Sequence, residues 1–298
     1  MLDYAALHAL AAVVREGSFE RAARALHVTP SAVSQRIRLL EERVGCALVV
    51  RGQPCTPTDT GRRMCQHMDR VRLLEQELTD ALPALAPEGG ARVALPVAVN
   101  ADSLATWFAP ALAAFAAQAP VLVELSVDDQ DHTAEWLRTG AVLAAVTGTA
   151  RPAAGCNSQP LGAMRYVAAA SPAYMARHFA AGVSAGSLAQ APSLVFNTKD
   201  ELQARWVRRL CHRHVELPRH MLPSSQAFVT AALAGMGWGL HPEALVDRHL
   251  ADGTLVELVP GTPLDVPLYW QSARAASLLL DGLARQLHAA ARAGLRPL

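Results

Sequence analysis

A stretch near the N-terminus of the sequence carries side chains that are suited to binding double-stranded DNA. Four polar residues recur there at helical spacing, namely Ser31, Ser34, Gln35 and Arg38. Residues three or four positions apart lie on the same face of a helix, so these side chains would project together. Glutamine and arginine form paired hydrogen bonds with adenine and guanine in the major groove, and serine hydroxyls bind phosphates. The pattern therefore predicts a helix that reads DNA.

Two short helices joined by a tight turn would present this face. Ser18 is a natural cap for the first helix, over residues 19–26, because its side chain can accept a backbone N–H. The turn follows at residues 27–28, and Thr29 caps the second helix, whose first residue is Pro30. The apolar residues expected to face inward are Val33, Ile37 and Leu40. This layout is typical of a helix-turn-helix.

The same pattern also fits an ordinary helical hairpin whose arginine-bearing face is in solvent, because short motifs match by chance. The turn has no glycine, although helix-turn-helix motifs commonly have one there. The apolar residues 47–50 then lead into Arg51-Gly-Gln-Pro54, which fits either a wing that touches the DNA backbone or a plain surface hairpin. The predicted DNA-contacting residues are Ser18, Thr29, Pro30, Ser31, Ser34, Gln35, Arg36, Arg38 and Arg51.

The composition of the whole chain restricts the class of protein. Its 298 residues correspond to two or three domains, and a content of 51% hydrophobic and 18% charged residues excludes a disordered chain. The formal net charge is only +1, whereas residues 1–65 hold nine arginines and six acidic residues, so any basic surface is local. Five cysteines without a C-x-x-C pair indicate a reduced chain rather than a disulfide scaffold or a zinc site.

The start of the sequence and its apolar runs favour a cytoplasmic location. Residues 1–4 contain an acid where a signal peptide has basic residues. The apolar runs are also shorter than the ~20 residues that cross a bilayer. We therefore expect neither secretion nor membrane insertion.

A long amphipathic helix is predicted between the two halves of the chain. Apolar residues recur at steps of three and four over residues 64–85, which places one stripe along a helix. Thr58 or Thr60 caps its start, and Pro83 and the Pro/Gly cluster at 87–90 end it. Such a stripe forms either a dimer seam or the buried face of a helix packed on its own chain, and the polar residues on its other faces favour the dimer. The predicted seam residues are Met64, Met68, Val71, Leu74 and Leu78.

Strands alternate with helices through the rest of the sequence. Strand-like runs at 92–100, 121–127 and 141–147 are separated by helical stretches, and the alternation continues to a last helix at 275–291. Alternation at this length is typical of β-α-β units, which form a parallel sheet. We expect two α/β lobes.

The whole chain resembles the LysR-type transcriptional regulators. The resemblance is carried by GSFERAARALHVTPSAVSQRIRLLEERVG at 17–45 and by residues 47–51 and 56–61. It implies an α+β multi-domain fold with an N-terminal winged helix-turn-helix, a long linker helix for dimerisation and a two-lobed α/β effector-binding domain like type 2 periplasmic binding proteins. The implied domains are residues 1–60, 61–87 and 88–298, with lobe I at 91–163 and 266–298 and lobe II at 164–265.

A narrower resemblance concerns one branch of that family. The segments Leu95–Trp107, 224–229 and 238–242 are similar to those of the ArgP/IciA/LysG branch, whose members sense lysine or arginine and control basic amino-acid export. This resemblance implies a sequence-specific regulator of basic amino-acid export or metabolism genes, whose effector is L-lysine or L-arginine. It also implies a homodimer or homotetramer on a double-stranded DNA operator, with RNA polymerase as a further partner and without a cofactor.

In this family the effector binds between the two lobes, where strands end and helices begin. The corresponding residues of this chain are Asn100, Asp102, Ser103, Asp128, Thr147, Phe196, Asn197, Ser224, Ser225, Gln226 and His241. A cationic effector requires a carboxylate, and Asp102, Asp128 and Asp129 are the nearest candidates. Asp102 fits a helix cap equally well, and a solvated loop is the plainer interpretation of the other two. The branch often has an acid at the position of Asn197.

The remaining motifs predict neither catalysis nor metal binding. The glycines at 235–239 follow a helix, whereas a phosphate-binding loop precedes one. His212 and His214 are two positions apart and would point to different sides of a helix. An alternative function is a cytosolic amino-acid-binding protein or enzyme with an accessory helical domain, because a fold does not determine function. A DNA-binding protein without sequence preference is a third interpretation.

Overall fold

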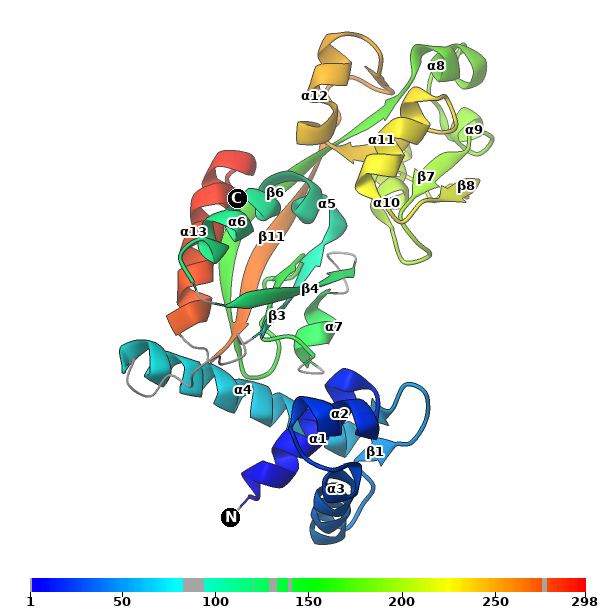
Figure 1. The fold of residues 1–298 in the computed structure, drawn as a ribbon. Helices are drawn as coiled ribbons and strands as arrows, with labels where there is room; N and C mark the ends of the chain where they lie inside the picture. The colour runs from blue at the N-terminus through cyan, green and yellow to red at the C-terminus, as the bar shows by residue number, and fades with distance from the viewer. Residues whose placement is uncertain (1, 83–93, 120, 129–132, 139–140, 275–277) are drawn as a thin grey trace. The chain divides into compact units, whose positions relative to one another are not determined.

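The structure is a computed structural model that describes residues 2–82, 94–119, 121–128, 133–138, 141–274 and 278–298. The chain divides into two units, residues 1–93 and 94–298, and each has a hydrophobic core of its own (Figure 1). The predicted Pro/Gly end of the linker helix, at 83–90, lies outside the described residues. Asp129 and the side chain of Asp128 also lie outside them.

Helices and one short hairpin make up the described part of the first unit. They are α1 (Tyr4–Glu16), α2 (Phe19–Ala25), α3 (Pro30–Val44), β1 (Val49–Val50), β2 (Thr56–Pro57) and α4 (Asp59–Ala81). The apolar faces of α1, α3 and α4 pack around one core, in which Leu10, Val33 and Met68 are buried. The predicted order of a helix-turn-helix, a hairpin and a long helix is present.

The helices of the first unit begin at side chains that cap them. Asp3, Ser18, Thr29 and Thr58 each accept a hydrogen bond from the backbone N–H three residues ahead, over 3.1 to 3.3 Å. These bonds satisfy N–H groups that have no partner inside the helix. The predicted caps at Ser18 and Thr29 are confirmed, and Thr58 rather than Thr60 caps α4.

The hairpin is fixed to the start of α4 by a close backbone approach. Thr58 donates its hydroxyl to the carbonyl oxygen of Ala47 at 2.9 Å and its N–H to that of Leu48 at 3.0 Å. A Cβ atom at Gly61 would overlap the Leu48 carbonyl, so only glycine fits this position. The hairpin and the long helix therefore form one rigid corner.

A mixed sheet of seven strands organises the described part of the second unit. Its order is β10-β6-β11-β5-β3-β4, and β9 also pairs with β6. The strands are β3 (Ala94–Asn100), β4 (Leu122–Asp128), β5 (Ala144–Thr147), β6 (Cys156–Ala170), β9 (Gly239–Pro242), β10 (Val256–Glu257) and β11 (Leu264–Ala273). The expectation of a parallel sheet holds for β3, β4 and β5. It is wrong for the rest, because β6 and β11 run antiparallel to their neighbours.

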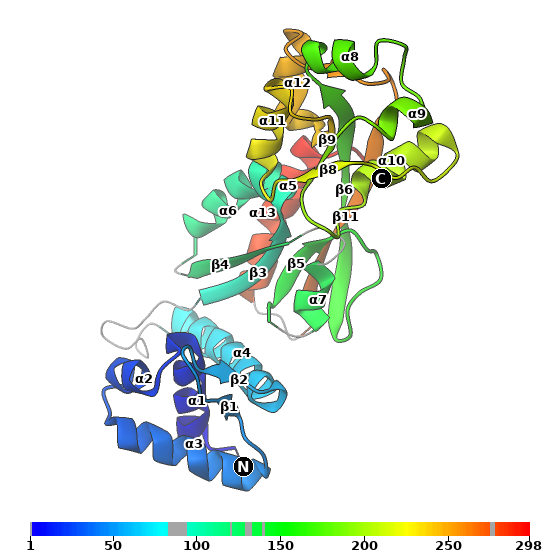
Figure 2. The same cartoon turned by 90° about the vertical axis from the view of Figure 1, so that its right-hand side faces the viewer.

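Two long strands, β6 and β11, connect two lobes (Figure 2). Lobe I contains β3, β4 and β5 with α5 (Ala101–Ser103), the π-helical turn η2 (Leu104–Phe108), α6 (Ala109–Ala116), α7 (Thr133–Arg138) and α13 (Leu278–Gly294). Lobe II contains β9 and β10 with α8 (Pro172–His178), α9 (Ala185–Leu188), β7 (Ser193–Val195), α10 (Leu202–Cys211), β8 (Arg219–Met221), α11 (Ser225–Leu233) and α12 (Glu243–Ala251). The predicted lobe boundary at 163/164 falls inside β6, and the one at 265/266 falls inside β11. Both boundaries stay predictions.

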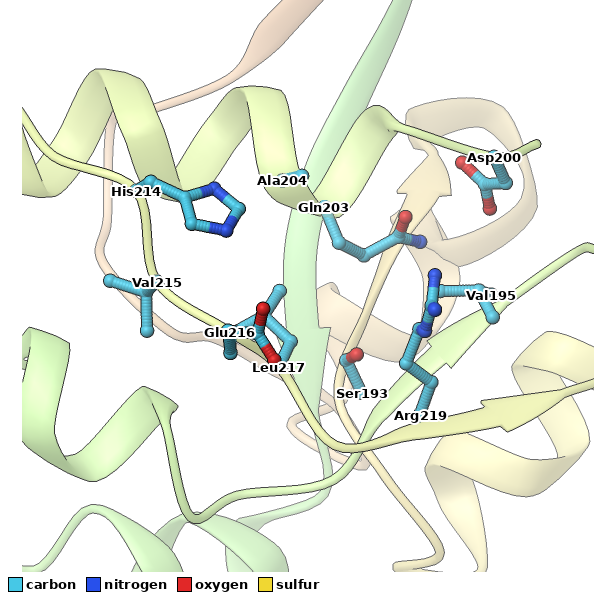
Figure 3. A pocket seen from close by; sticks show the side chains of 10 residues that line it. All are labelled: Ser193, Val195, Asp200, Gln203, Ala204, His214, Val215, Glu216, Leu217 and Arg219. Carbon is cyan, nitrogen blue, oxygen red and sulfur yellow. The ribbon is translucent and has the colours of Figure 1, made fainter. Parts of the chain in front are cut away.

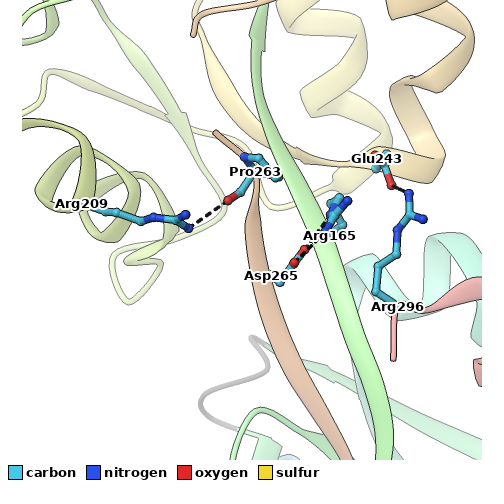
Figure 4. Close-up of polar contacts among 6 residues, drawn as sticks. All are labelled: Arg165, Arg209, Glu243, Pro263, Asp265 and Arg296. Carbon is cyan, nitrogen blue, oxygen red and sulfur yellow. Dashed lines mark hydrogen bonds and ion pairs between the residues drawn. The ribbon is translucent and has the colours of Figure 1, made fainter. Parts of the chain in front are cut away.

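Polar contacts brace the region where these strands pass between the lobes (Figure 4). Arg165 on β6 and Asp265 on β11 are opposite each other in the register and form two hydrogen bonds of 2.8 Å. Arg296, near the end of the chain, donates to Glu243 at the start of α12 over 2.6 Å. The first contact joins β6 to β11, and the second ties α12 of lobe II to the segment that follows α13 of lobe I.

Candidate DNA-binding and effector-binding sites

Helix α3 has one buried face and one exposed face. Val33, Ile37 and Leu40 are buried in the core of the first unit. Ser31, Gln35 and Arg38 are exposed, together with Thr29 and Pro30 at the start of the helix, and Ser34 and Arg36 are half-buried. The predicted division of this helix into an apolar inner face and a polar outer face is therefore present. An exposed helix face of this kind can enter a major groove.

Arg38 forms an ion pair with Glu42, one helical turn further on. The Arg38 Nε and Glu42 Oε1 atoms are 2.8 Å apart, and both side chains are largely exposed. Exposed pairs of this spacing contribute little to stability, because water and salt screen their charges. The Arg38 guanidinium can thus exchange its carboxylate partner for a DNA phosphate or base at small cost.

The turn between α2 and α3 explains how the motif forms without a glycine. His27 adopts a left-handed backbone conformation with a φ of 54°, the region that glycine occupies most readily. The Val28 N–H then donates to the Ala23 carbonyl oxygen at 3.0 Å and closes the turn. The missing glycine is therefore no argument against a helix-turn-helix here.

The wing lies against the start of α2. The guanidinium carbon of exposed Arg51 is 5.2 Å from the ring centre of Phe19, a cation–π distance. The Cys55 N–H donates to the Gly17 carbonyl oxygen at 2.8 Å, which holds the hairpin against the turn that follows α1. Arg51 is thus placed beside Ser18, which caps α2 and donates its hydroxyl to Glu20 at 2.7 Å.

The apolar stripe of α4 divides into two parts. Met68 is only 1% exposed and belongs to the core of the first unit, and Met64 and Val71 pack against that core. Leu74 and Leu78 are 56% and 52% exposed, and Leu82 beyond them is 50% exposed. A side chain buried in its own chain has little surface left for a partner. Met68 is therefore closed to a partner, Met64 and Val71 keep part of their surface, and the predicted seam is most exposed at Leu74 and Leu78.

In the second unit, Asp102 joins the two lobes. It follows β3 of lobe I and accepts hydrogen bonds from the Tyr166 hydroxyl of β6 at 2.8 Å and from the Ser225 hydroxyl of α11 at 2.5 Å. The π-helical turn begins two residues later, and π-helical turns are frequent at functional sites. Sequence reasoning selected Asp102 and Ser225 but missed Tyr166, which lies in the middle of a strand.

Polar atoms without partners lie around this point. In the described residues, the side-chain amide of Asn100 and the Ser103 hydroxyl are buried and lack a hydrogen-bond partner. Asn100 ends β3 two residues before Asp102, whereas His241 on β9 lies opposite Val167, on the face of the sheet away from Tyr166, and its ring contacts Phe228 edge-on. Buried polar groups are normally paired, so such a group points to a bound ligand or water.

Burial shifts the protonation of two of these side chains. Removal from water raises the pKa of the Asp102 carboxyl, and the negative charge of Asp200 raises it further, although the bonds from Ser225 and Tyr166 act in the opposite direction. Burial also lowers the pKa of His241 to about 4. The imidazole of His241 is therefore neutral at physiological pH.

The other predicted effector residues have varied surroundings. Ser224 caps α11, Gln226 is exposed, and Thr147 donates its hydroxyl to the Thr149 carbonyl oxygen. Phe196 and Asn197 are half-buried, and the Asn197 side chain accepts the Lys199 N–H at 2.7 Å in a local turn. Asp128 ends β4 opposite Asn100 in the register.

Asp200 is a buried acid that sequence reasoning missed. Its carboxylate accepts the N–H groups of Phe196 at 2.8 Å and Leu202 at 3.0 Å, which fixes the turn before α10. It is close enough to Asp102 to influence that carboxyl electrostatically. An acid is thus present near Asn197, three positions later than in the branch pattern. Its proximity to Asn197 was the signal that could have identified it.

Two classes of site are absent from the described part of the chain. It contains no group of three or more histidine, cysteine, aspartate or glutamate side chains that could hold a metal ion. Among the helices described, none combines the length and the apolar character needed to span a membrane.

Comparisons with known proteins give consistent matches over the whole chain. The model of the bacterial regulatory helix-turn-helix protein, lysR family, matches residues 4–62, and the model of the LysR substrate binding domain matches residues 88–292. The transcriptional regulator ArgP of Pseudomonas aeruginosa is 50% identical over 297 residues, which cover 99% of this chain and 98% of that protein.

Two solved structures are similar over their full length. The crystal structure of ArgP from Mycobacterium tuberculosis has a TM-score of 0.86 and 43% identity, with 100% of both chains covered. Full-length LysG from Corynebacterium glutamicum with bound effector Arg has a TM-score of 0.74 and 36% identity, with 99% of this chain and 100% of that chain covered.

Proposed function

This chain belongs to the LysR family of bacterial transcriptional regulators, and we propose that its activity is set by L-arginine or L-lysine bound beside Asp102. Members of this family are regulators rather than enzymes. The alternative prediction was a cytosolic amino-acid-binding protein or enzyme with an accessory helical domain, and the family membership is that of a transcriptional regulator instead. The relative LysG carries arginine as its effector, which supports a basic amino acid here.

In this proposal, α3 enters the major groove of an operator. Gln35 and Arg38 contact base edges or phosphates from the exposed face, with Ser31, Ser34 and Arg36 beside them. Arg51 on the wing contacts the DNA backbone. Thr29, Pro30 and Ser18 act mainly by shaping the two helices, since the hydroxyls of Thr29 and Ser18 already serve as caps.

The single observation that supports the effector site is the carboxylate of half-buried Asp102, which is held by Tyr166 and Ser225 where the two lobes meet. A buried carboxylate is costly without a cation. An ammonium or guanidinium group that enters beside Asp102 supplies one. The unpartnered groups of Asn100 and Ser103 offer hydrogen bonds to the rest of the ligand.

Binding at this point acts on the contact between the lobes. In the absence of ligand, the hydrogen bond from Ser225 to Asp102 joins α11 to α5. A ligand that binds the Asp102 carboxylate competes with this bond, and it therefore changes which arrangement of the two lobes is more stable. It does so only as far as it binds one arrangement better than the other. Two chains pair through the exposed part of α4, and the dimer presents two reading helices to a symmetric operator in the cytoplasm.

Calorimetric titration of the full-length protein with L-arginine and L-lysine tests the effector assignment. We expect saturable binding by the wild type, at least tenfold weaker binding (about 1.4 kcal/mol) by Asp102→Asn and no change in Asp281→Asn. Asp281 is an exposed acid of the same lobe, so its variant controls for loss of charge alone. Wild-type binding that survives in Asp102→Asn would refute the role of Asp102.

A further inference from the structure

A separate cavity of about 170 Å³ lies within lobe II (Figure 3). Its walls come from β7, from α10, from β8 and from the loop that joins α10 to β8. Its polar lining residues are Ser193, Asp200, Gln203, His214, Glu216 and Arg219. One water occupies roughly 30 Å³ of the liquid, so the cavity has room for a small ligand rather than a single water molecule.

Gln203 is the polar group that most needs a partner in this cavity. Its side chain is 2% exposed, and neither its carbonyl oxygen nor its amide nitrogen has a hydrogen-bond partner. Figure 3 shows this amide pointing into the cavity, on the side where Arg219 and Asp200 also lie. An amide both donates and accepts, so a molecule that satisfies Gln203 must offer an acceptor and a donor.

The charges around the cavity have both signs. Arg219 is exposed on β8 and presents a guanidinium group, which only donates hydrogen bonds. Glu216 on the loop and Asp200 before α10 present carboxylates, which only accept them. A simple anion would meet two carboxylates, and a simple cation would meet the guanidinium. A molecule with one positive and one negative group fits both.

The cavity also shares a wall with the effector region. The Asp200 carboxylate that lines it holds the Phe196 N–H, and Phe196 is one of the predicted effector residues. Gln203 follows Leu202, whose N–H the same carboxylate holds. A ligand that contacts Gln203 therefore touches the helix turn that positions Phe196.

We propose that this cavity is an accessory ligand site of lobe II that takes a small zwitterion, a molecule with one carboxylate and one ammonium group. The carboxylate binds the Arg219 guanidinium and the Gln203 amide nitrogen. The ammonium group donates to the Gln203 carbonyl oxygen and to Glu216. The site is distinct from the one beside Asp102, and only its coupling to the effector rests on the proposed function.

Ligand-observed NMR with the full-length protein tests this site. The background is Asp102→Asn, which weakens the proposed effector site, and the probes are L-serine, acetate and methylammonium. We expect L-serine to bind at least tenfold more tightly than the two singly charged probes, a difference of about 1.4 kcal/mol. Gln203→Met and Arg219→Gln each weaken L-serine binding by a similar factor. Arg213→Gln removes the same charge from a nearby exposed position and leaves binding unchanged.

Three results would overturn the proposal. They are the absence of saturable L-serine binding, binding of acetate as tight as that of L-serine, and L-serine binding that persists in both Gln203→Met and Arg219→Gln. The circular dichroism spectrum of each variant must match the parent, so that loss of binding reports on the cavity. Retention of L-arginine binding by Asp102→Asn would count against the proposed effector site, whereas the accessory site is decided at Gln203 and Arg219.

Discussion

The carboxylate of Asp102 in lobe I lies 2.5 Å from the hydroxyl of Ser225 in lobe II. The two residues are brought together only by the fold, since Asp102 follows β3 and Ser225 opens α11. Because this hydrogen bond crosses from one lobe to the other, the pKa of Asp102 depends on how the two lobes are arranged.

The Asp102→Asn variant is expected to be more stable than the wild type at neutral pH in the absence of effector. Burial raises the pKa of Asp102 in the folded chain, so its contribution to stability is complete below the unfolded pKa and is lost as the pH rises through the folded pKa. The asparagine side chain does not titrate, so the variant does not lose this stability as the pH rises. Melting temperatures measured from pH 4 upwards should diverge in favour of the variant, by ~2–4 °C for each kcal/mol. Parallel curves would contradict this prediction.

The contribution of His241 to stability is expected to depend on pH in the opposite direction to that of Asp102. Its pKa is lowered from 6.5 to about 4 by burial, so the stability that it contributes is complete above pH 6.5 and is lost as the pH falls toward 4. In urea unfolding, the free energy of unfolding of His241→Asn should fall less steeply than that of the wild type across this window. Equal slopes for the two proteins would show that His241 is not a buried neutral imidazole.

Two substitutions on α3 should weaken DNA binding in different ways. Gln35→Ala should cost about 1–3 kcal/mol on a selected operator and less on random duplex, because a base contact is lost. Arg38→Ala should weaken binding to both duplexes and reduce the salt dependence, because a phosphate contact is lost. Fluorescence anisotropy at several salt concentrations measures both effects, with Arg248→Ala in lobe II as the control. Unchanged affinity in both α3 variants would refute the assignment of this face.

The exposed part of α4 should control dimer formation. Leu74→Ser and Leu78→Ser each remove apolar surface that a partner would cover, and burial of a leucine side chain is worth about 1.5–3 kcal/mol. We expect the dimer dissociation constant to rise at least tenfold in sedimentation equilibrium. Met236→Ser removes an exposed apolar side chain elsewhere and should leave the constant unchanged. A dimer that withstands both leucine substitutions would exclude this surface as the seam.

Local signals explain most of what the sequence predicted correctly. The caps at Ser18 and Thr29 and the inward face of α3 depend on residues a few positions apart, so they could be identified without the fold. Strand β6 extends from Cys156 to Ala170, and only its second half has a strand-like sequence. Pro160 and Gly162 hide its first half, because strands disfavour both residue types. Pairing with β11 compensates for this local preference.

Tertiary contacts account for what the sequence did not predict. The periodicity of α4 gave Met68 and Leu74 the same status, yet only Met68 meets the core built by α1 and α3. Tyr166 and Asp200 carry no local signal of a site, and their link to Asp102 exists only because β6 and lobe II fold around it. Strand direction is likewise set by the path of the chain, which alternation alone does not contain.

The joint between the lobes is a ribbon of two paired strands rather than a pair of loose loops. Backbone pairing of β6 with β11 continues from Leu264 opposite Tyr166 to Ala273 opposite Cys156, with one register shift between Leu268 and Tyr269. A register shift of this kind bends the strand locally and increases its twist. We therefore expect a change in the angle between the lobes to be taken up at this point, while the backbone pairing on either side of it stays in place.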